Sequence, residues 1–313
     1  MNQKIKLDNG PAAIAQLAAF IREANGRVAV LSGAGISTGS GIPDYRGPNG
    51  VYARNKDYKP IQYNQFVTSH SFRKKYWARS FLGWKQILSA QPNATHTALL
   101  SLRSNGWTNA GIITQNVDGL LGRDRILELH GTLHKVACIS CNHEIPRSDF
   151  QQELIKLNPL FAEKLDSHKE PVAIGLRAPT ESGKSNDQDM SNPDGDVEIS
   201  WNYDKFEYPS CASCQTGVYK PDVVFFGENM RNAVRDESFK IVSDATHLLL
   251  VGTSLQVFSS FRLLKHAESL GHRIAAVNLG EFRGSEIPNI IVDASSDEVL
   301  PELVHALGEK NKN

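Results

Sequence analysis

The chain has 313 residues, of which 40% are hydrophobic and 22% charged, so it is long enough to bury a core and unlike a disordered protein. Its 34 basic and 34 acidic residues cancel, which removes any bulk attraction to nucleic acid or to an anionic membrane. No apolar run approaches the ~20 residues of a membrane helix. Residues 1–20 show neither a signal peptide nor a transit-peptide pattern. The composition therefore predicts a soluble globular protein.

The elements predicted in chain order alternate between helices and buried strands. An amphipathic helix follows Pro11, and its apolar residues are Ile14, Leu17, Ala18 and Ile21. Short apolar runs, each followed by a polar loop, predict strands at 28–31, 111–114, 223–226, 247–251 and 274–277. Helical patterns lie between several of them, at 95–104, 231–243 and 259–270. This alternation predicts an α/β fold with a Rossmann-like, doubly wound parallel sheet.

Two stretches interrupt the alternation and predict smaller modules within one folded unit over 1–313. Residues 48–89 are rich in aromatic side chains and indicate a helical module. Residues 138–217 contain all four cysteines, and the acidic, apolar-poor part at 181–200 indicates a mobile loop. The Rossmann-like core is then expected from residues 11–47, 90–137 and 218–305.

The cysteine spacing predicts a metal site. Cys138 with Cys141, and Cys211 with Cys214, form two Cys-x-x-Cys pairs, each of which can present two thiolates to one tetrahedral Zn²⁺. The 69 residues between the pairs exceed the usual separation, so the intervening segment is an excursion. A redox pair is the alternative, but neither pair opens a helix beside a βαβ strand. We expect one closed, structural zinc ion and a reducing compartment.

Polar residues follow several predicted strands, at the sheet edge where ligands bind in such folds. The glycine-rich loop 33–37 could hold a pyrophosphate on its backbone N–H groups, and a plain tight turn is the alternative. Asn116, Asp118 and His130 supply an amide, a carboxylate and an imidazole near the same edge. Capping and turn chemistry is the alternative for each of these residues taken alone.

Taken together, these motifs resemble the sirtuin family in order and spacing, over about residues 28–300. They are Gly33–Ser37, Gly41–Gly47, Thr114–Asp118, His130–Gly131, both cysteine pairs, Lys220–Glu228, Gly252–Leu255 and Asn278–Gly280. Within the family, residues 76–84 and the long excursion resemble the class II, sirtuin-4-like branch. The resemblance implies an NAD-dependent protein-lysine deacylase, a sirtuin-type transferase that releases nicotinamide and 2′-O-acyl-ADP-ribose. A protein mono-ADP-ribosyltransferase and a catalytically silent NAD or ADP-ribose binding module are the alternatives.

The resemblance also implies roles for individual residues. His130 is the general base that activates the ribose hydroxyls, Asn116 orients the ribose, and Asp118 binds the nicotinamide amide. The implied NAD-binding residues are Gly33, Ala34, Gly35, Ile42, Asp44, Tyr45, Arg46, Gln115, Asn116, Val117, Asp118, Gly252, Thr253, Ser254, Asn278, Leu279, Gly280 and Ser296. The segment expected to pair with the target peptide is Val224, Phe225, Phe226 and Gly227.

Tyr76 and Arg79 stand at i, i+3 spacing on a predicted helix, which resembles the Tyr-x-x-Arg arrangement of another sirtuin class that removes acidic acyl groups. A core tyrosine beside a solvated arginine is the alternative. The expected partners are acyl-lysine proteins or peptides, with no direct contact to nucleic acid or membrane and with the chain as a monomer. The sirtuin-4-like branch favours the mitochondrial matrix, while the missing transit pattern leaves the cytoplasm or nucleus open.

Overall fold

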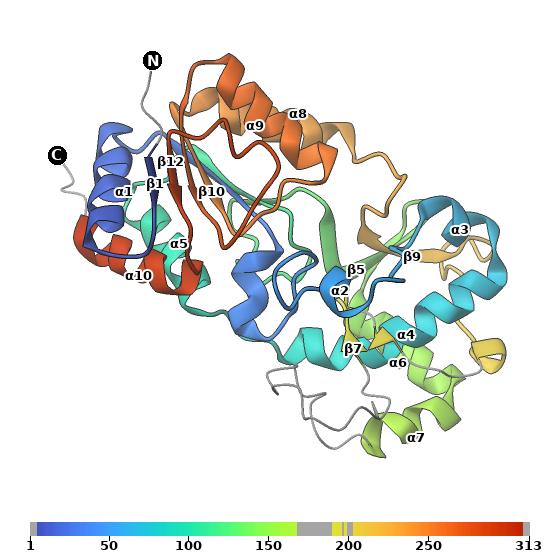
Figure 1. The fold of residues 1–313 in the computed structure, drawn as a ribbon. Coiled ribbons are helices and arrows are strands. Elements are labelled where there is room, and N and C mark those ends of the chain that lie inside the picture. The colour runs from blue at the N-terminus through green and yellow to red at the C-terminus, as the bar shows by residue number, and fades with distance from the viewer. Residues whose placement is uncertain (1–4, 168–189, 196, 199–202, 309–313) are drawn as a thin grey trace, which may run out of the picture.

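The structure is a computed structural model that describes residues 5–167, 190–195, 197–198 and 203–308. A seven-stranded parallel sheet lies at the centre of the larger of its two units (Figure 1). Its strands are β1 (Ile5–Leu7), β2 (Val28–Ser32), β3 (Gly111–Thr114), β4 (Ile126–Glu128), β10 (His247–Val251), β11 (Arg273–Val277) and β12 (Ile290–Val292). They lie in the order β1-β12-β11-β10-β2-β3-β4, and every neighbouring pair is parallel. The predicted doubly wound fold is confirmed.

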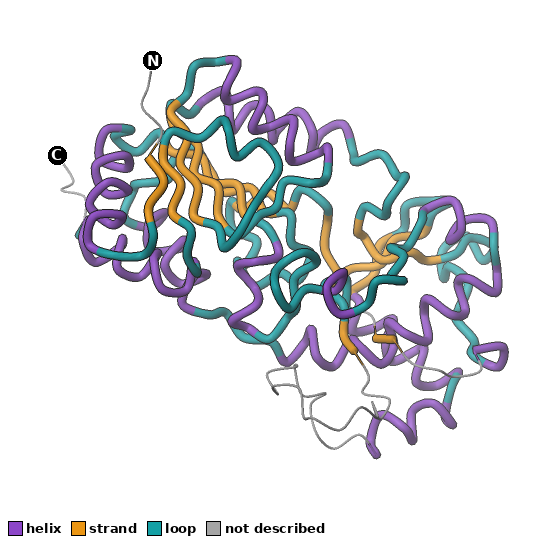
Figure 2. Tube along the Cα trace, in the orientation of Figure 1, coloured by secondary structure: helices purple, strands orange, loops and turns teal. Residues whose placement is uncertain are grey.

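Helices cover both faces of this sheet, which explains why its central strands are continuously apolar. The helices are α1 (Pro11–Glu23), α5 (Ala94–Ser104) and α10 (Ser296–Leu307) on one face, and α8 (Asn232–Asp244) and α9 (Phe258–Ser269) on the other (Figure 2). Side chains alternate along β10, so Leu249 packs in the core with the first set, whereas Leu248 and Leu250 pack with the second.

A second unit lies beside the sheet and has its own hydrophobic core. Its antiparallel sheet has the order β6-β5-β9, from β5 (Gly131–Cys138), β6 (Glu144–Pro146) and β9 (Tyr219–Val223). Its helices are α2 (Val51–Arg54), α3 (Tyr63–Thr68), α4 (His70–Ser89), α6 (Arg147–Leu157) and α7 (Pro159–Ser167). The short elements β7 (Met190–Ser191), β8 (Val197–Glu198) and the 3-10 turn η2 (Tyr203–Lys205) complete its described part.

The aromatic module and the cysteine-bearing module share that one core. Trp77 and Phe81 of α4 pack in the same cluster as Phe150 of α6 and Phe206. The rings of Trp77 and Phe150 lie 4.5 Å apart between centroids. Because neither module encloses these large rings alone, the two form a single folded unit around them.

The structure corrects two of the expected boundaries. The strand expected at 223–226 ends at Val223 and pairs antiparallel with β5, not within the parallel sheet. Residues 131–137, assigned above to the Rossmann-like core, belong to this smaller sheet as well. The mixed apolar and polar sequence of β5 fits a strand whose side chains are only partly buried.

Most of the acidic loop expected at 181–200 lies outside the described residues, which there are 190–195 and 197–198. Strands β1, β4 and β12 have only three residues each. The sequence analysis predicts neither these strands nor the helix α10. Among the described helices, none combines the length and apolar character required to cross a membrane.

Candidate active site and metal centre

The main cavity lies at the carboxyl ends of the central strands and has a volume of about 770 Å³. Strands β3 and β4 lie on one side of β2, and β10, β11 and β12 lie on the other. The direction in which successive strands are added to the sheet therefore reverses between β2 and β10. Ligand sites of open α/β sheets form at such switch points, because loops diverge there and leave a crevice. The second unit closes the opposite side, with Ile61 and residues 223–229 in the wall.

The glycine-rich loop after β2 packs closely against the loop after β10. The Gly33 amide donates to Val251 O at 3.1 Å, and the Gly35 amide donates to Gly252 O at 2.9 Å. A Cβ atom added to Gly35 would lie 2.8 Å from Gly252 O, closer than such atoms approach in proteins. Glycine is therefore required for this contact. The loop continues as a 3-10 helix, η1 (Ala34–Ser40), which is wound more tightly than an α-helix.

His130 reaches the cavity from the junction between the two units. Its Nδ1 lies 3.1 Å from Gln115 O, and because a carbonyl oxygen only accepts hydrogen bonds, Nδ1 carries the proton. In the neutral ring Nε2 is then the basic nitrogen. Burial lowers the pKa of His130 to about 4, although the bond to the Gln115 carbonyl acts in the opposite direction. The imidazole is thus neutral at physiological pH and able to accept a proton.

The backbone of His130 is hydrogen-bonded to the segment 224–227, which the sequence analysis expects to pair with a peptide. His130 O accepts a hydrogen bond from Val224 N at 2.8 Å. The next residue, Gly131, has φ +80, and a Cβ atom there would lie 2.0 Å from Asp222 O. Only glycine fits this close approach of β5 to β9. The proposed base and the proposed peptide-binding segment are therefore held in one fixed relation.

Asn116 and Asp118 meet on a shared serine that the sequence did not single out as a site residue. Ser37 Oγ donates to Asp118 Oδ2 at 2.7 Å and accepts from Asn116 Nδ2 at 2.9 Å. His96 Nε2 lies 3.5 Å from the same hydroxyl. Burial lowers the pKa of His96, while the Asp118 and Asp297 carboxylates raise it. This buried network fixes both side chains at the cavity floor.

The structure gathers nearly all of the predicted NAD and peptide residues around the one cavity. Those that line it are Gly33, Ala34, Gly35, Ile42, Asp44, Tyr45, Arg46, Gln115, Asn116, Val117, Asp118, His130, Val224, Phe225, Phe226, Gly227, Gly252, Thr253, Ser254, Asn278, Leu279 and Ser296. Gly280 is not among them, but its carbonyl accepts a bond from Asn278 Nδ2 at 3.0 Å and so helps to place that residue. Burial raises the pKa of Asp44, and its carboxylate caps the turn at Gly47.

Tyr76 and Arg79 do not line the cavity. Tyr76 is buried in the aromatic core, with its ring 5.3 Å from that of Phe66 and 5.4 Å from that of Phe225. Arg79 directs its Nε–H to Val197 O at 3.1 Å. The geometry therefore gives no support to their expected part in acyl recognition and agrees with the alternative of a core tyrosine.

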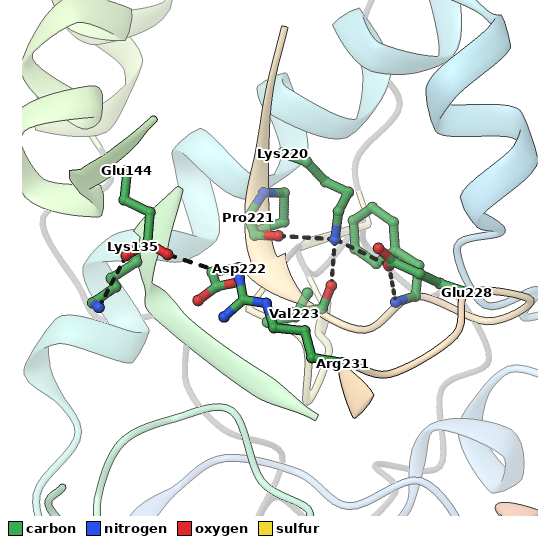
Figure 3. A network of polar contacts seen from close by, with 9 residues as sticks. Lys135, Glu144, Lys220, Pro221, Asp222, Val223, Glu228 and Arg231 are labelled. Carbon is green, nitrogen blue, oxygen red and sulfur yellow. Dashed lines mark hydrogen bonds and ion pairs between the residues drawn. The ribbon is translucent and has the colours of Figure 1, made fainter. Parts of the chain in front are cut away.

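A half-buried ion pair shapes the predicted peptide segment (Figure 3). Lys220 Nζ lies 3.0 Å from Glu228 Oε2 and also donates to the carbonyl oxygens of Pro221 and Val223. The same carboxylate oxygen accepts the Phe225 amide at 2.9 Å. Burial lowers the pKa of Lys220, and attraction to Glu228 opposes that shift. The pair thus holds the turn that carries residues 224–227.

Phe226 already has main-chain partners within the chain. Its amide donates to Ile61 O at 3.3 Å, and its carbonyl accepts from Tyr63 N at 2.9 Å. Both main-chain polar groups of Phe226 are therefore engaged within the chain.

Several cavity residues were not predicted from the sequence. Pro193 and Asp194, from the excursion between the cysteine pairs, reach the cavity wall, as do Phe258 and Ser259 at the start of α9. Phe258 and Ser259 come directly after the loop that follows β10, and this position in the sequence could have indicated that they line the cavity. Pro193 and Asp194 had none, because an acidic, apolar-poor segment is typical of a solvated loop.

The four cysteines converge on one point in the second unit. All four Sγ atoms lie within 4.8 Å of one another, with 3.8 Å between Cys138 and Cys214 and 3.6 Å between Cys141 and Cys211. Four sulfurs at ~2.3 Å from a tetrahedral Zn²⁺ would be about 3.8 Å apart, so the spacing fits a metal ion. A Cβ atom on Gly217 would lie 2.3 Å from Cys138 Sγ, which shows how closely the chain wraps the site. With four thiolates the shell is closed, as in structural zinc sites.

The fold, the cavity and the cysteine site together define a class of NAD-binding protein with a zinc module. The chain belongs to the Sir2 family, because the sequence model of that family matches residues 33–259. It is 50% identical over 298 residues to the NAD-dependent protein deacylase SIR4 of Batrachochytrium dendrobatidis, with 93% of each chain covered. It is 38% identical over 300 residues to the NAD-dependent protein lipoamidase sirtuin-4, mitochondrial, of Homo sapiens, covering 93% of this chain and 86% of that one. The resemblance to the sirtuin-4-like branch is confirmed.

Solved structures agree with this assignment. A mutant of a Sir2 homologue in complex with ADP-ribose is 25% identical with a TM-score of 0.66, covering 93% of this chain and 95% of that chain. A Sir2 protein solved with a p53 peptide and NAD⁺ is 23% identical with a TM-score of 0.65, covering 94% and 98%, and shows the same fold.

Proposed function

We propose that this chain is an NAD-dependent protein-lysine deacylase. The observation that carries the proposal is the neutral His130 imidazole, whose Nε2 lies in a cavity bounded by the glycine-rich loop on one side and residues 224–227 on the other. A base placed between a nucleotide site and a peptide site fits a reaction that joins the two substrates. The relatives named as NAD-dependent deacylases support the same reaction.

The reaction proceeds in two stages. The acyl oxygen of an acyl-lysine attacks C1′ of the nicotinamide ribose, the C1′–N bond breaks, and nicotinamide leaves with the bonding electron pair. His130 Nε2 then takes the proton of a ribose hydroxyl, whose oxygen attacks the acyl carbon. Addition of water and loss of the lysine amine give free lysine and 2′-O-acyl-ADP-ribose. The lowered pKa keeps the His130 ring neutral until it takes this proton.

The remaining cavity residues bind and orient. Asn116 and Asp118, fixed through Ser37, hold the nicotinamide ribose and the nicotinamide amide. The loops 33–35 and 252–254 receive the phosphates and the adenosine half, together with Asn278 and Ser296. Zinc, when bound by the four cysteines, supplies structural cross-linking and no open coordination position for chemistry.

The substrates are acyl-lysine proteins or peptides, and the chain works as a monomer without direct contact to nucleic acid or membrane. Relatives are named lipoamidase, deacylase and deacetylase, so their names point to no single acyl group, and a panel of acyl peptides decides which one this chain removes. Two of the relatives are named mitochondrial, which favours the mitochondrial matrix.

The test is a panel of acetyl, glutaryl and lipoyl peptides incubated with NAD⁺ and followed by mass spectrometry. We expect deacylated peptide and O-acyl-ADP-ribose in equal amounts, and loss of both on the order of 10²–10⁴-fold in H130A. H305A, which removes an exposed histidine of α10, is the matched control. ADP-ribosylated protein without any deacylated peptide would instead support a mono-ADP-ribosyltransferase, and absence of NAD⁺ turnover would support a silent binding module.

A further inference from the structure

A serine hydroxyl contacts the basic nitrogen of His130. Ser259 Oγ lies 2.8 Å from His130 Nε2, and both residues line the cavity. Since Nδ1 carries the proton and donates to Gln115 O, Nε2 accepts and the serine hydroxyl donates. The imidazole is therefore held at both nitrogens, by a carbonyl on one side and a hydroxyl on the other.

Both anchors are themselves fixed. The Gln115 amide donates to Ser32 O at 3.0 Å, and its side chain donates to Thr253 Oγ1 at 2.8 Å. Ser259 lies in the first turn of α9, whose Leu263 and Leu264 are fully buried against the sheet. Because a serine side chain has one rotatable carbon bond with three staggered positions, the helix backbone restricts its oxygen to a few places.

A hydroxyl is suited to a partner whose protonation changes. It donates to Nε2 while the ring is neutral, and after a turn about its C–O bond it accepts from Nε2–H once the ring has taken a proton. The second bond is charge-assisted and therefore the stronger of the two. Such a contact favours the protonated ring that forms during the reaction over the neutral ring of the resting enzyme, which is the condition for acceleration.

We propose that Ser259 is a positioning residue for His130: its hydroxyl holds the orientation of the ring by donating to Nε2 in the empty enzyme, and it accepts from Nε2–H after the ribose hydroxyl has lost its proton. The proposal rests on the deacylase function proposed above. It makes Ser259 important for the second stage of the reaction only, because nicotinamide leaves before the base acts.

The kinetic test compares S259A with wild type in two assays. We expect kcat for deacylation to fall about tenfold, while the KM for NAD⁺ and the rate of nicotinamide–NAD⁺ base exchange stay within twofold. S259T, which keeps a hydroxyl, should recover most of the loss. S260A is the matched control, because it removes the neighbouring hydroxyl, which bonds Val257 O and does not face His130. In the H130A background, S259A should have no further effect.

Deacylation by S259A within twofold of wild type would overturn the proposal, as would base exchange that falls in step with deacylation or a further loss in the H130A background. A spectroscopic readout separates this from failure of the deacylase proposal. Nitrogen NMR of the imidazoles at pH 7 should show His130 as the Nδ1–H tautomer in both proteins, because Gln115 O holds that proton, with the Nε2 resonance shifted in S259A, where the hydrogen bond from the serine is lost. An Nε2–H tautomer in wild type would overturn the inference even if the enzyme shows no deacylation.

Discussion

At the scale of single residues, the environment of His130 predicts the pH range in which the proposed deacylase works. Burial removes water from the ring and favours its neutral form, which lowers the pKa from 6.5 to about 4. The proposed base can therefore still accept a proton at pH values at which an exposed histidine is already protonated. His130 therefore differs from a solvent-exposed histidine in the pH at which it becomes protonated.

We expect the acidic limb of kcat/KM to fall toward pH 4, with no loss attributable to His130 between pH 8 and 5.5. The same shift affects stability: between pH 6.5 and 4 the unfolded chain binds the proton and the folded chain does not, so the free energy of unfolding decreases as the pH falls through this range. Kinetics and urea unfolding of wild type and H130A at several pH values measure both effects. A limb centred near pH 6.5 would show that the ring is solvated in the working enzyme.

Arg79 provides a second test at this scale. Its Nε–H bonds Val197 O, and the side chain does not line the cavity, so R79M should leave the ratio of kcat/KM for glutaryl and acetyl peptides within twofold of wild type. K75M, at an exposed position of the same helix, is the control for loss of positive charge. A tenfold fall in the ratio for R79M alone would restore the acyl-binding role that the Tyr-x-x-Arg spacing predicts.

At the scale of elements, the segment after β9 depends on one half-buried ion pair, Lys220 with Glu228. Lys220 satisfies two carbonyl oxygens and the Glu228 carboxylate, which in turn accepts the Phe225 amide. If one partner is removed, the other charge and these hydrogen-bond acceptors remain poorly solvated. The free energy of unfolding then falls far more than it does on losing an exposed pair. The proposed peptide-binding segment is therefore held in place by the Lys220–Glu228 pair.

We expect K220M to lower the free energy of unfolding by about 3 kcal/mol and to raise the KM for peptide about tenfold, with the KM for NAD⁺ within twofold. R231Q is the matched control: Arg231 pairs with Asp222 on the same stretch, but its side chain is 62% exposed, so its loss should cost less than ~1 kcal/mol. Urea denaturation and steady-state kinetics measure the two quantities. Equal effects of K220M and R231Q would show that the ion pair has no part in ordering the segment.

At the scale of the whole molecule, the sequence predicts the parallel sheet and the zinc site well, because each has a local signature. Buried strands give continuous apolar runs at 28–31 and 247–251, and paired thiolates recur at fixed spacing. Three-residue strands such as β4 carry too little pattern to be found. The placement of Arg147, which is 1% exposed and lies over the ring of Trp77, also had no local signal, because it depends on packing between α4 and α6.

The cavity shows the same limit. Residues that follow strands, such as Gln115 and Thr253, are placed at the site by topology alone, so the sequence could indicate them. The contact between Ser259 and His130 joins residues 129 positions apart and depends on how α9 and β5 dock. Asp194 reaches the cavity from an excursion whose composition is typical of solvent exposure. Long-range docking, more than local pattern, decides these positions.

The zinc site tests how the two units depend on each other, because β5 begins beside His130 and ends at Cys138. Loss of the metal should loosen the end of β5 and β9 and, through them, the base and the peptide segment. We expect one zinc ion per chain, and we expect C138A to lose it, lower Tm by about 10 °C and lose deacylation together with solubility. S140A, between the two cysteines of the same pair, is the matched control. Elemental analysis, thermal unfolding and activity after chelation measure these effects, and a metal-free C138A protein with unchanged Tm and activity would show that the cysteines have no structural role.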